Sequence, residues 1–246
     1  MCDSGARRGY GWRGWRCPAP TALLQPMGDW IDLSHPLNCD TPRVPLFPEP
    51  VFEQIYRMPE RPINVTRMDM VVHIGTHVDS PRHFFLDGPA LEDVPLARLA
   101  GRGIVWPVPV PGSSLVEPEH LAGLRGRLSA GDILILNTGW HRFAGSPAYD
   151  NDHPALSVAA AEWIVEQGVK LVGFDVPTPD LPVARRPKGF DYPVHRTLLS
   201  QGVLIAEHLT NLSALDGSHV EVMCACLNIT GADGAPARVM ARAVRS

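Results

Sequence analysis

The 246-residue sequence lacks several features that would place it in a class at once. Its apolar runs, such as GVLIA and DILIL, are far shorter than the roughly 18 residues that a membrane span needs. The formal net charge is −4, without the basic stripe that usually marks a nucleic-acid-binding protein. We therefore expect a protein that binds neither membrane nor nucleic acid.

Cysteine pairs and nucleophile motifs are also missing. None of the five cysteines stands in a CxxC pair, and the odd count without a secretory signal indicates reduced thiols and a cytoplasmic location. Cys224 and Cys226 are two apart in a strand-like run, so we expect them to share one face and to pack as small hydrophobes. The sequence contains no GxSxG motif and no cysteine in a matching context, which argues against a serine or thiol nucleophile.

The first 26 residues differ from the rest of the chain. They show neither clear periodicity nor the continuous apolar region of a signal peptide. We expect a disordered tail over 1–26 and one domain over 27–246, with Met27 as a candidate natural start. The segment GYGWRG in this tail matches GxGxxG, but no predicted strand precedes it and no helix follows, so a dinucleotide site is not indicated.

The remaining chain alternates strands and helices only in places. Strands are expected over 30–37, 65–72, 101–110, 131–140, 169–176, 203–209 and 219–230, and helices over 117–128, 157–168 and 195–202. Residues 39–64 contain six prolines and are expected to form an irregular loop. No repeat or linker divides the core, and the pattern predicts a single α/β domain with a mixed β-sheet.

The stretch VVHIGTHVDSPRHFF, residues 71–85, holds three of the ten histidines and an aspartate. One interpretation is an amphipathic helix with His73 and His77 on one face, but Gly75, the β-branched neighbours and Pro81 disfavour a helix. A second is that each histidine is satisfied separately in the core. A third is a metal site, and four potential ligands or proton carriers so close together favour it.

The metal-site interpretation has a simple geometry. Gly75 tolerates the positive φ of a sharp turn. His77 and Asp79 are two apart in an extended segment, so their side chains point the same way, and His73 can fold back toward them. Imidazole and carboxylate groups suit a divalent ion such as zinc or manganese. Beyond Pro81, His83 is then available as an acid–base residue.

The pattern His-x-Gly-Thr-His-x-Asp-x-Pro-x-His resembles the signature of the cyclase family, which includes bacterial kynurenine formamidase and isatin hydrolase. DLSHPL near the start, TGW at 138–140, GFD at 173–175, HRTLL at 195–199 and GADGAPARVMA near the end are also similar to family sequences. The resemblance covers about Trp30 to Val244. It implies a swivelling β/β/α fold and an enzyme that uses one or two zinc ions, or manganese, to activate water.

The resemblance also implies residue roles. A second ion would take Asp79 with a histidine and a glutamate twelve positions apart, which this chain supplies as His195 and Glu207. These two stand at opposite ends of a predicted helix–turn–strand unit, and such ends can converge in an α/β fold. The implied catalytic residue is His83, and the implied metal ligands are His73, His77, Asp79, His195 and Glu207.

Further residues are candidates for the surroundings of the site. Phe47, Phe84 and Trp140 could form walls for an aromatic or heterocyclic substrate, although core packing is an alternative for Phe84 and Trp140. The family's Trp-Pro-Gly-like segment is LFPEP here, which leaves the substrate open. His208, where the family often has asparagine, should face away from Glu207. Four other side chains have weaker claims: His35 as a hydrogen-bonding core residue, His153 as a possible metal neighbour, Asp175 as a support for a ligand or loop, and Glu49 in place of a glycine.

Two functions remain open at this stage. One is a metal-dependent hydrolase of amide-type bonds, such as aryl formamides or cyclic amides. The other is a non-hydrolytic protein on the same scaffold, either a biosynthetic cyclase or dehydratase or a metal-holding binding protein. Family members associate as homodimers or homotetramers, so we expect a homo-oligomer in which residues 39–64 could reach a partner's pocket.

Overall fold

The computed structural model describes residues 30–44 and 46–244 of the chain. The predicted disordered tail, with its GYGWRG segment, and the candidate start Met27 lie outside the described residues.

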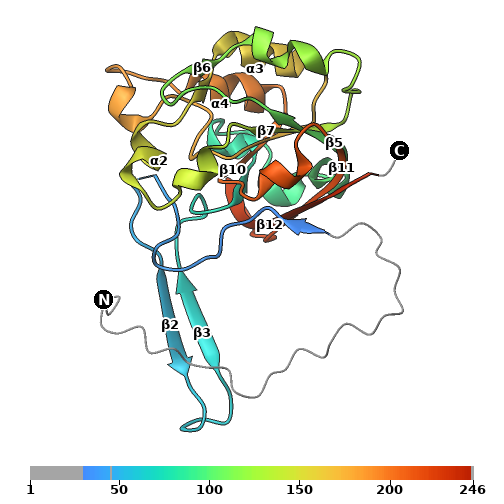
Figure 1. Ribbon diagram of the computed structural model, residues 1–246. Coiled ribbons are helices and arrows are strands. Elements are labelled where there is room, and N and C mark those ends of the chain that lie inside the picture. Colours follow the sequence, from blue (N-terminus) through green and yellow to red (C-terminus); the bar gives the residue numbers. More distant parts are fainter. Residues whose placement is uncertain (1–29, 45, 245–246) are drawn as a thin grey trace.

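A mixed sheet forms the centre of the molecule (Figure 1). Its eight strands are β1 (Ile31–Asp32), β4 (His77–Asp79), β5 (Ala100–Pro107), β7 (Ile133–Asn137), β9 (Leu171–Phe174), β10 (Leu204–Glu207), β11 (His219–Cys226) and β12 (Gly234–Ala243). Their order is β1-β12-β11-β5-β7-β9-β10-β4, and β12 also pairs with β4, which closes the sheet into a barrel. The β5–β7–β9–β10 pairings are parallel and the others antiparallel, so the predicted mixed sheet is confirmed.

Both faces of the parallel strands are buried. In β7, Leu134 and Leu136 belong to one hydrophobic cluster, whereas Ile133 and Ile135 belong to another. The first cluster also contains side chains of the helices, and the second contains side chains from β10, β11 and β12. A strand with core on both faces needs no polar alternation, which explains the continuous apolar run in this segment.

The helices are α1 (Leu96–Leu99), α2 (Pro147–Asn151), α3 (Val158–Glu166) and α4 (Pro193–Ser200). Helices α3 and α4 pack against each other at the top of the view in Figure 1. Ser157 caps α3, because its Oγ accepts a hydrogen bond from the Ala160 N–H at 3.1 Å. Helices α3 and α4 bury the apolar face of the sheet that carries the first cluster.

The helix expected over 117–128 is wrong in type. Residues Pro118–Leu124 form a 3-10 helix instead. Gly123 packs closely on Trp106, since a Cβ at this glycine would lie 2.7 Å from the indole Cη2. A glycine inside and a proline at the start both weaken an α-helix here.

The expectation of an irregular loop over 39–64 is wrong for residues 51–56, which form a strand. Strand β2 (Val51–Tyr56) pairs antiparallel with β3 (Val65–Asp69), and this hairpin projects away from the body of the molecule (Figure 1). The prolines that indicated a loop flank the strand, before it at Pro48 and Pro50 and in the connection to β3 at Pro59 and Pro62. A further small pair joins β6 (Leu115–Val116) to β8 (Ala155–Leu156). None of the helices described is both long enough and apolar enough to cross a membrane.

Candidate metal centre

The centre forms around β4, which lies between β10 and β12. In the antiparallel register His77 lies opposite Glu207 of β10, and Asp79 lies opposite Gly234 of β12. Side chains directly opposite each other have Cβ atoms roughly 4.5–5.5 Å apart, so register alone brings His77 and Glu207 together. His77 Nε2 lies 3.3 Å from Glu207 Oε2 and 3.3 Å from Asp79 Oδ1, which places His77 and Asp79 on one side as the alternation predicts.

The turn before β4 orients the imidazole of His77. Gly75 has φ 63°, and a Cβ there would lie 2.6 Å from Thr41 Cγ2, so the position needs glycine. The Gly75 carbonyl lies 2.7 Å from His77 Nδ1 and, as an acceptor, requires that this nitrogen carry the proton. In the neutral ring, Nε2 therefore presents its lone pair to the carboxylates of Asp79 and Glu207.

His73 folds back to the same site, as the sequence predicts. Its Nδ1 lies 2.8 Å from Asp79 Oδ1, and its Nε2 lies 2.8 Å from Asp233 Oδ2. Its ring stacks on that of His83, with the ring centroids 3.8 Å apart. Gly234 makes room for this ring, because a Cβ there would lie 2.7 Å from His73 Cε1.

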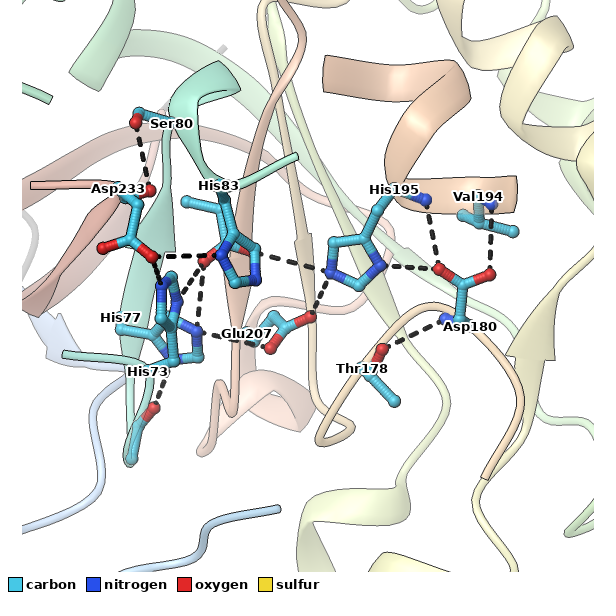
Figure 2. Close-up of polar contacts among 12 residues, drawn as sticks. His73, His77, Ser80, His83, Thr178, Asp180, Val194, His195, Glu207 and Asp233 are labelled. Carbon is cyan, nitrogen blue, oxygen red and sulfur yellow. Dashed lines mark hydrogen bonds and ion pairs between the residues drawn. The ribbon is translucent and has the colours of Figure 1, made fainter. Parts of the chain in front are cut away.

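Asp233 is a residue of the site that the sequence interpretation missed. Its Oδ2 atom contacts both His73 and His83, the latter through Nδ1 at 3.2 Å (Figure 2). Both the backbone N–H and the hydroxyl of Ser80 donate to its carbonyl at 3.0 Å. The GADG segment resembled family sequences, but nothing in it indicated that its aspartate would contact two histidines 150 or more positions away.

His195 and Glu207 converge on Asp79. His195 Nε2 lies 3.1 Å from Glu207 Oε1 and 3.6 Å from Asp79 Oδ2. Helix α4 carries His195 in its first turn, and β10 ends at Glu207 after a short connection. The two ends of this helix–turn–strand unit thus meet as expected.

Asp180 is the second residue that was missed. It lies on the side of His195 away from Glu207 (Figure 2) and contacts His195 Nδ1 through Oδ2 at 2.6 Å. The backbone N–H groups of Val194 and His195 also donate to its carboxylate, each at 3.1 Å. Asp180 therefore caps the start of α4 and fixes the ring whose other nitrogen faces the site.

The donor set fits a divalent cation. Three groups place one donor atom of each member within 4.8 Å of the others: His73–Asp79–His83, His77–Glu207–His208 and Asp79–His195–Glu207. Within the described residues, His77 Nε2 and Asp79 Oδ2 are buried and make no hydrogen bond. Buried polar atoms are rarely left without a partner, and an ion is a common explanation. Imidazole nitrogen and carboxylate oxygen are suitable ligands for such an ion.

The electrostatics of the site point the same way. Burial alone lowers the pKa of His77, but Asp79 and Glu207 outweigh it and raise this pKa to about 10. Burial also lowers the pKa of His195, but its contacts with Asp180, Asp79 and Glu207 outweigh burial and raise this pKa well above its usual value. Buried carboxylates that raise imidazole pKa values in this way favour positive charge at the centre, which either protons or a metal ion can supply.

His208 does not face away from Glu207, so that expectation is wrong. It lies just beyond β10 with φ 55°, which breaks the strand alternation. Its buried ring lies 5.9 Å from that of His77, and its Nδ1 lies 3.0 Å from the Tyr149 hydroxyl. His153 is also buried, with its Nδ1 2.9 Å from the Pro154 carbonyl.

A cavity of about 280 Å³ opens onto the centre. The candidate substrate residues Phe47 and Phe84 line it, together with Arg186 and Tyr192. Trp140 is not among the described lining residues of this cavity. Trp140 packs in the first hydrophobic cluster, the one that contains helix side chains. There its indole N–H donates to the Tyr149 carbonyl at 3.2 Å.

Asp175 holds a loop rather than contacting the centre. Its fully buried carboxylate accepts hydrogen bonds from the Thr138 N–H at 3.0 Å and hydroxyl at 2.7 Å, and it lies 3.0 Å from His141 Nδ1. Of the other weaker candidates, Glu49 pairs with Arg43 at 3.1 Å, and the backbone N–H of His35 donates to Thr76 Oγ1.

The family model described as "Putative cyclase" matches residues 31–181, more than half of the chain. The chain belongs to this family. The kynurenine formamidase of Bacillus mycoides is 30% identical over 220 residues, which cover 87% of this chain and 98% of the relative. Both the family model and a relative matched over nearly its full length therefore support the membership of this chain in the cyclase family.

Solved structures show the same fold. Isatin hydrolase A from Labrenzia aggregata, bound to benzyl benzoate, superposes with a TM-score of 0.80 at 23% identity, covering 88% of this chain and 94% of that one. A structure described as a predicted metal-dependent hydrolase from Bacillus stearothermophilus has a TM-score of 0.71 at 26% identity and covers 87% and 97%. The predicted cyclase-family fold is thus confirmed.

Proposed function

We propose that this protein is a metal-dependent hydrolase that cleaves an amide-type bond, in an aryl formamide or a cyclic amide. The observation that carries the proposal is the convergence of His195 and Glu207 on Asp79, beside His83, at the edge of a cavity with aromatic walls. Its relatives include a kynurenine formamidase and, among solved structures, an isatin hydrolase, and both names describe hydrolases.

The proposed ligands are the five residues named from the sequence: His73, His77, Asp79, His195 and Glu207. Zinc is the first candidate and manganese the second, since sites built of histidine and carboxylate serve both. When bound, the ion would make hydroxide available near neutral pH and polarise the substrate carbonyl. Asp79, which contacts the rings on both sides, can serve either one ion or two.

His83 is the proposed acid–base residue. Burial holds its pKa below the usual range, so the ring is neutral at neutral pH. A neutral ring donates its Nδ1–H to Asp233, at 3.2 Å, and leaves Nε2 free to accept a proton. His83 can then take a proton from the attacking water and return it to the leaving nitrogen, a role usually worth roughly 10²–10⁴-fold in rate.

The proposed substrate is small and aromatic or heterocyclic. Phe47 and Phe84 line the cavity, and Phe84 lies 4.8 Å from the His195 ring and 5.3 Å from the Tyr192 ring, measured between centroids. An aromatic ring bound among these side chains would place a formyl or ring carbonyl beside the metal ligands.

We also propose that the protein is a homodimer or homotetramer in which the β2–β3 hairpin contacts a partner. An isolated two-stranded hairpin is only marginally stable in water, and this one carries apolar side chains that are about half exposed, among them Ile55 (47%), Met58 (56%) and Ile63 (52%). A cytoplasmic location is proposed as well, since the three cysteines in the described residues are free thiols.

Turnover tests the proposal directly. Zinc- or manganese-loaded protein should hydrolyse formanilide, N-formylkynurenine or isatin, lose this activity to a chelator and regain it when metal is restored. His83→Ala should lose turnover but keep its metal. Metal-loaded protein that acts on none of these compounds would favour a cyclase or dehydratase on the same scaffold.

A further inference from the structure

The loop between Asp180 and α4 places an arginine in the cavity. Arg186 is the one arginine or lysine among the described lining residues. It forms no ion pair with any carboxylate in the described part of the chain, in contrast to Arg196 ten positions later, which pairs with Asp191. A partly buried cation without an anionic partner, in a cavity beside a candidate catalytic centre, is available to a ligand.

The guanidinium of Arg186 is held in one orientation. Its Nε–H donates to the Leu181 carbonyl at 2.9 Å, and Nη1 donates to the Tyr192 hydroxyl at 3.1 Å. Its Cζ atom also lies 4.7 Å from the centroid of the Tyr192 ring and 5.4 Å from that of Phe190. A guanidinium has five N–H groups, so three remain, including both on Nη2. A fixed, planar fork of this kind suits a carboxylate.

Arg186 and several residues of the centre line the same cavity, and Tyr192 lies beside both Arg186 and the centre. Tyr192 contacts Arg186 and also lies 6.2 Å from the ring of His195, measured between centroids. A volume of about 280 Å³ is small for a ligand pocket and fits one aromatic ring with short substituents. A ring bound here would have its reacting carbonyl at the histidine side and another substituent at the arginine side.

We propose that Arg186 binds a carboxylate of the substrate, so that the enzyme selects aromatic amides that carry a negative charge. This inference rests on the proposed hydrolase function, and it adds the substrate class and the residue that recognises it. Neutral aryl amides would bind through the aromatic walls alone and would be poorer substrates.

The chain offers a matched control. Arg185 is adjacent and exposed, and its Nη1 donates to the Ser113 carbonyl at 3.2 Å, away from the lining residues of the cavity. Arg185→Gln removes the same charge from the same loop as Arg186→Gln. Arg186→Lys keeps the charge but loses the planar fork.

The experiment compares zinc-loaded wild type with these three variants. The substrates are the ortho, meta and para isomers of formamidobenzoate, each paired with its methyl ester. The ratio of kcat/KM for acid over ester cancels general damage to the enzyme. Binding of the matching aminobenzoates by calorimetry needs no turnover and measures the carboxylate contact separately. Thermal unfolding of each variant reports whether the fold keeps its stability.

For at least one isomer, Arg186→Gln should lower the acid-to-ester ratio and weaken aminobenzoate binding by roughly 10- to 100-fold, the usual range for a hydrogen bond to a charged group. Arg185→Gln should leave both unchanged, and Arg186→Lys should fall between. Equal ratios and equal aminobenzoate affinities in Arg186→Gln and Arg185→Gln would overturn the inference while leaving the hydrolase intact. If wild type hydrolyses none of the six compounds, the hydrolase proposal fails for them, and the aminobenzoate titration still decides the role of Arg186.

Discussion

Replacing Asp180 with asparagine should weaken metal binding although no candidate ligand is changed. The carboxylate contacts His195 Nδ1 at 2.6 Å and accepts two backbone N–H groups at the start of α4. Asparagine keeps the size but offers one acceptor oxygen and no charge, so His195 loses its anionic partner. Loss of such a partner behind a metal-ligating histidine typically costs roughly 10- to 100-fold in affinity, or about 1.4–2.7 kcal/mol.

The same substitution should also lower the stability of the metal-free protein. A hydrogen bond to a charged group contributes about 1.5–3 kcal/mol. For a chain of this length, each 1 kcal/mol shifts Tm by roughly 2–4 °C. We therefore expect a decrease of roughly 3–12 °C for Asp180→Asn.

Competition with a chromophoric chelator gives the zinc affinity, elemental analysis gives the stoichiometry, and calorimetry gives Tm. Asp175→Asn is the matched control, because Asp175 is equally buried and holds the Thr138 loop without contacting the centre. It should lower Tm but leave zinc affinity unchanged. If Asp180→Asn lowers Tm and still binds zinc as wild type does, then Asp180 merely caps the helix and the positioning argument is refuted.

Other substitutions test other parts of the structure. His73→Ala should reduce the bound metal measured by elemental analysis, whereas His83→Ala should keep it and lose turnover by roughly 10²–10⁴-fold; full metal content in His73→Ala would remove His73 from the ligand set. Burial raises the pKa of Asp150 to about 6, above its unfolded value, so its contribution to stability is present below about pH 4 and is lost as pH rises through 6. At pH 8, Asp150→Asn should therefore raise the free energy of unfolding by about 1 kcal/mol, after allowance for partial exposure, and should raise Tm with it. At pH 3.5 it should leave Tm unchanged. An equal shift of Tm at the two pH values would contradict this. Combined Ile55→Ser and Ile63→Ser substitutions should convert the proposed oligomer to monomer in sedimentation velocity without lowering Tm of the core, and an unchanged sedimentation coefficient would exclude the hairpin from the interface.

Local chemistry made the first half of the site predictable. The positive φ of Gly75 and the shared side of His77 and Asp79 depend on residues within a few positions of one another, and the structure has both. The assignment of His195 and Glu207 to the site depended on the family resemblance, because the sheet order that brings β4 beside β10 cannot be obtained from spacing alone. Once that order exists, the register fixes which residue faces His77.

The missed residues share a physical cause. Asp180 and Asp233 act through contacts with residues that are 15 and 160 positions away in the sequence, and neither stands in a pattern that would indicate such a contact. His208 was misplaced because strand alternation was extended one residue beyond β10, where a left-handed backbone ends it. The β2–β3 hairpin was missed because its prolines flank the strand instead of interrupting it.

The composition of the centre explains why a cation belongs there. Asp79, Asp180 and Glu207 are almost fully buried, and within the described residues none of them pairs with an arginine or lysine. Burying uncompensated carboxylates costs several kcal/mol each. Their charge can be balanced only by protons on the neighbouring imidazoles or by a metal ion. A divalent ion held by the same side chains offsets more negative charge than one proton does, and it leaves the imidazoles neutral, which is the form in which they can act as ligands. Arg186 lines the same cavity as Glu207 but forms no ion pair with any of these three carboxylates, so the proposed role in binding the substrate does not compete with the role of the cation.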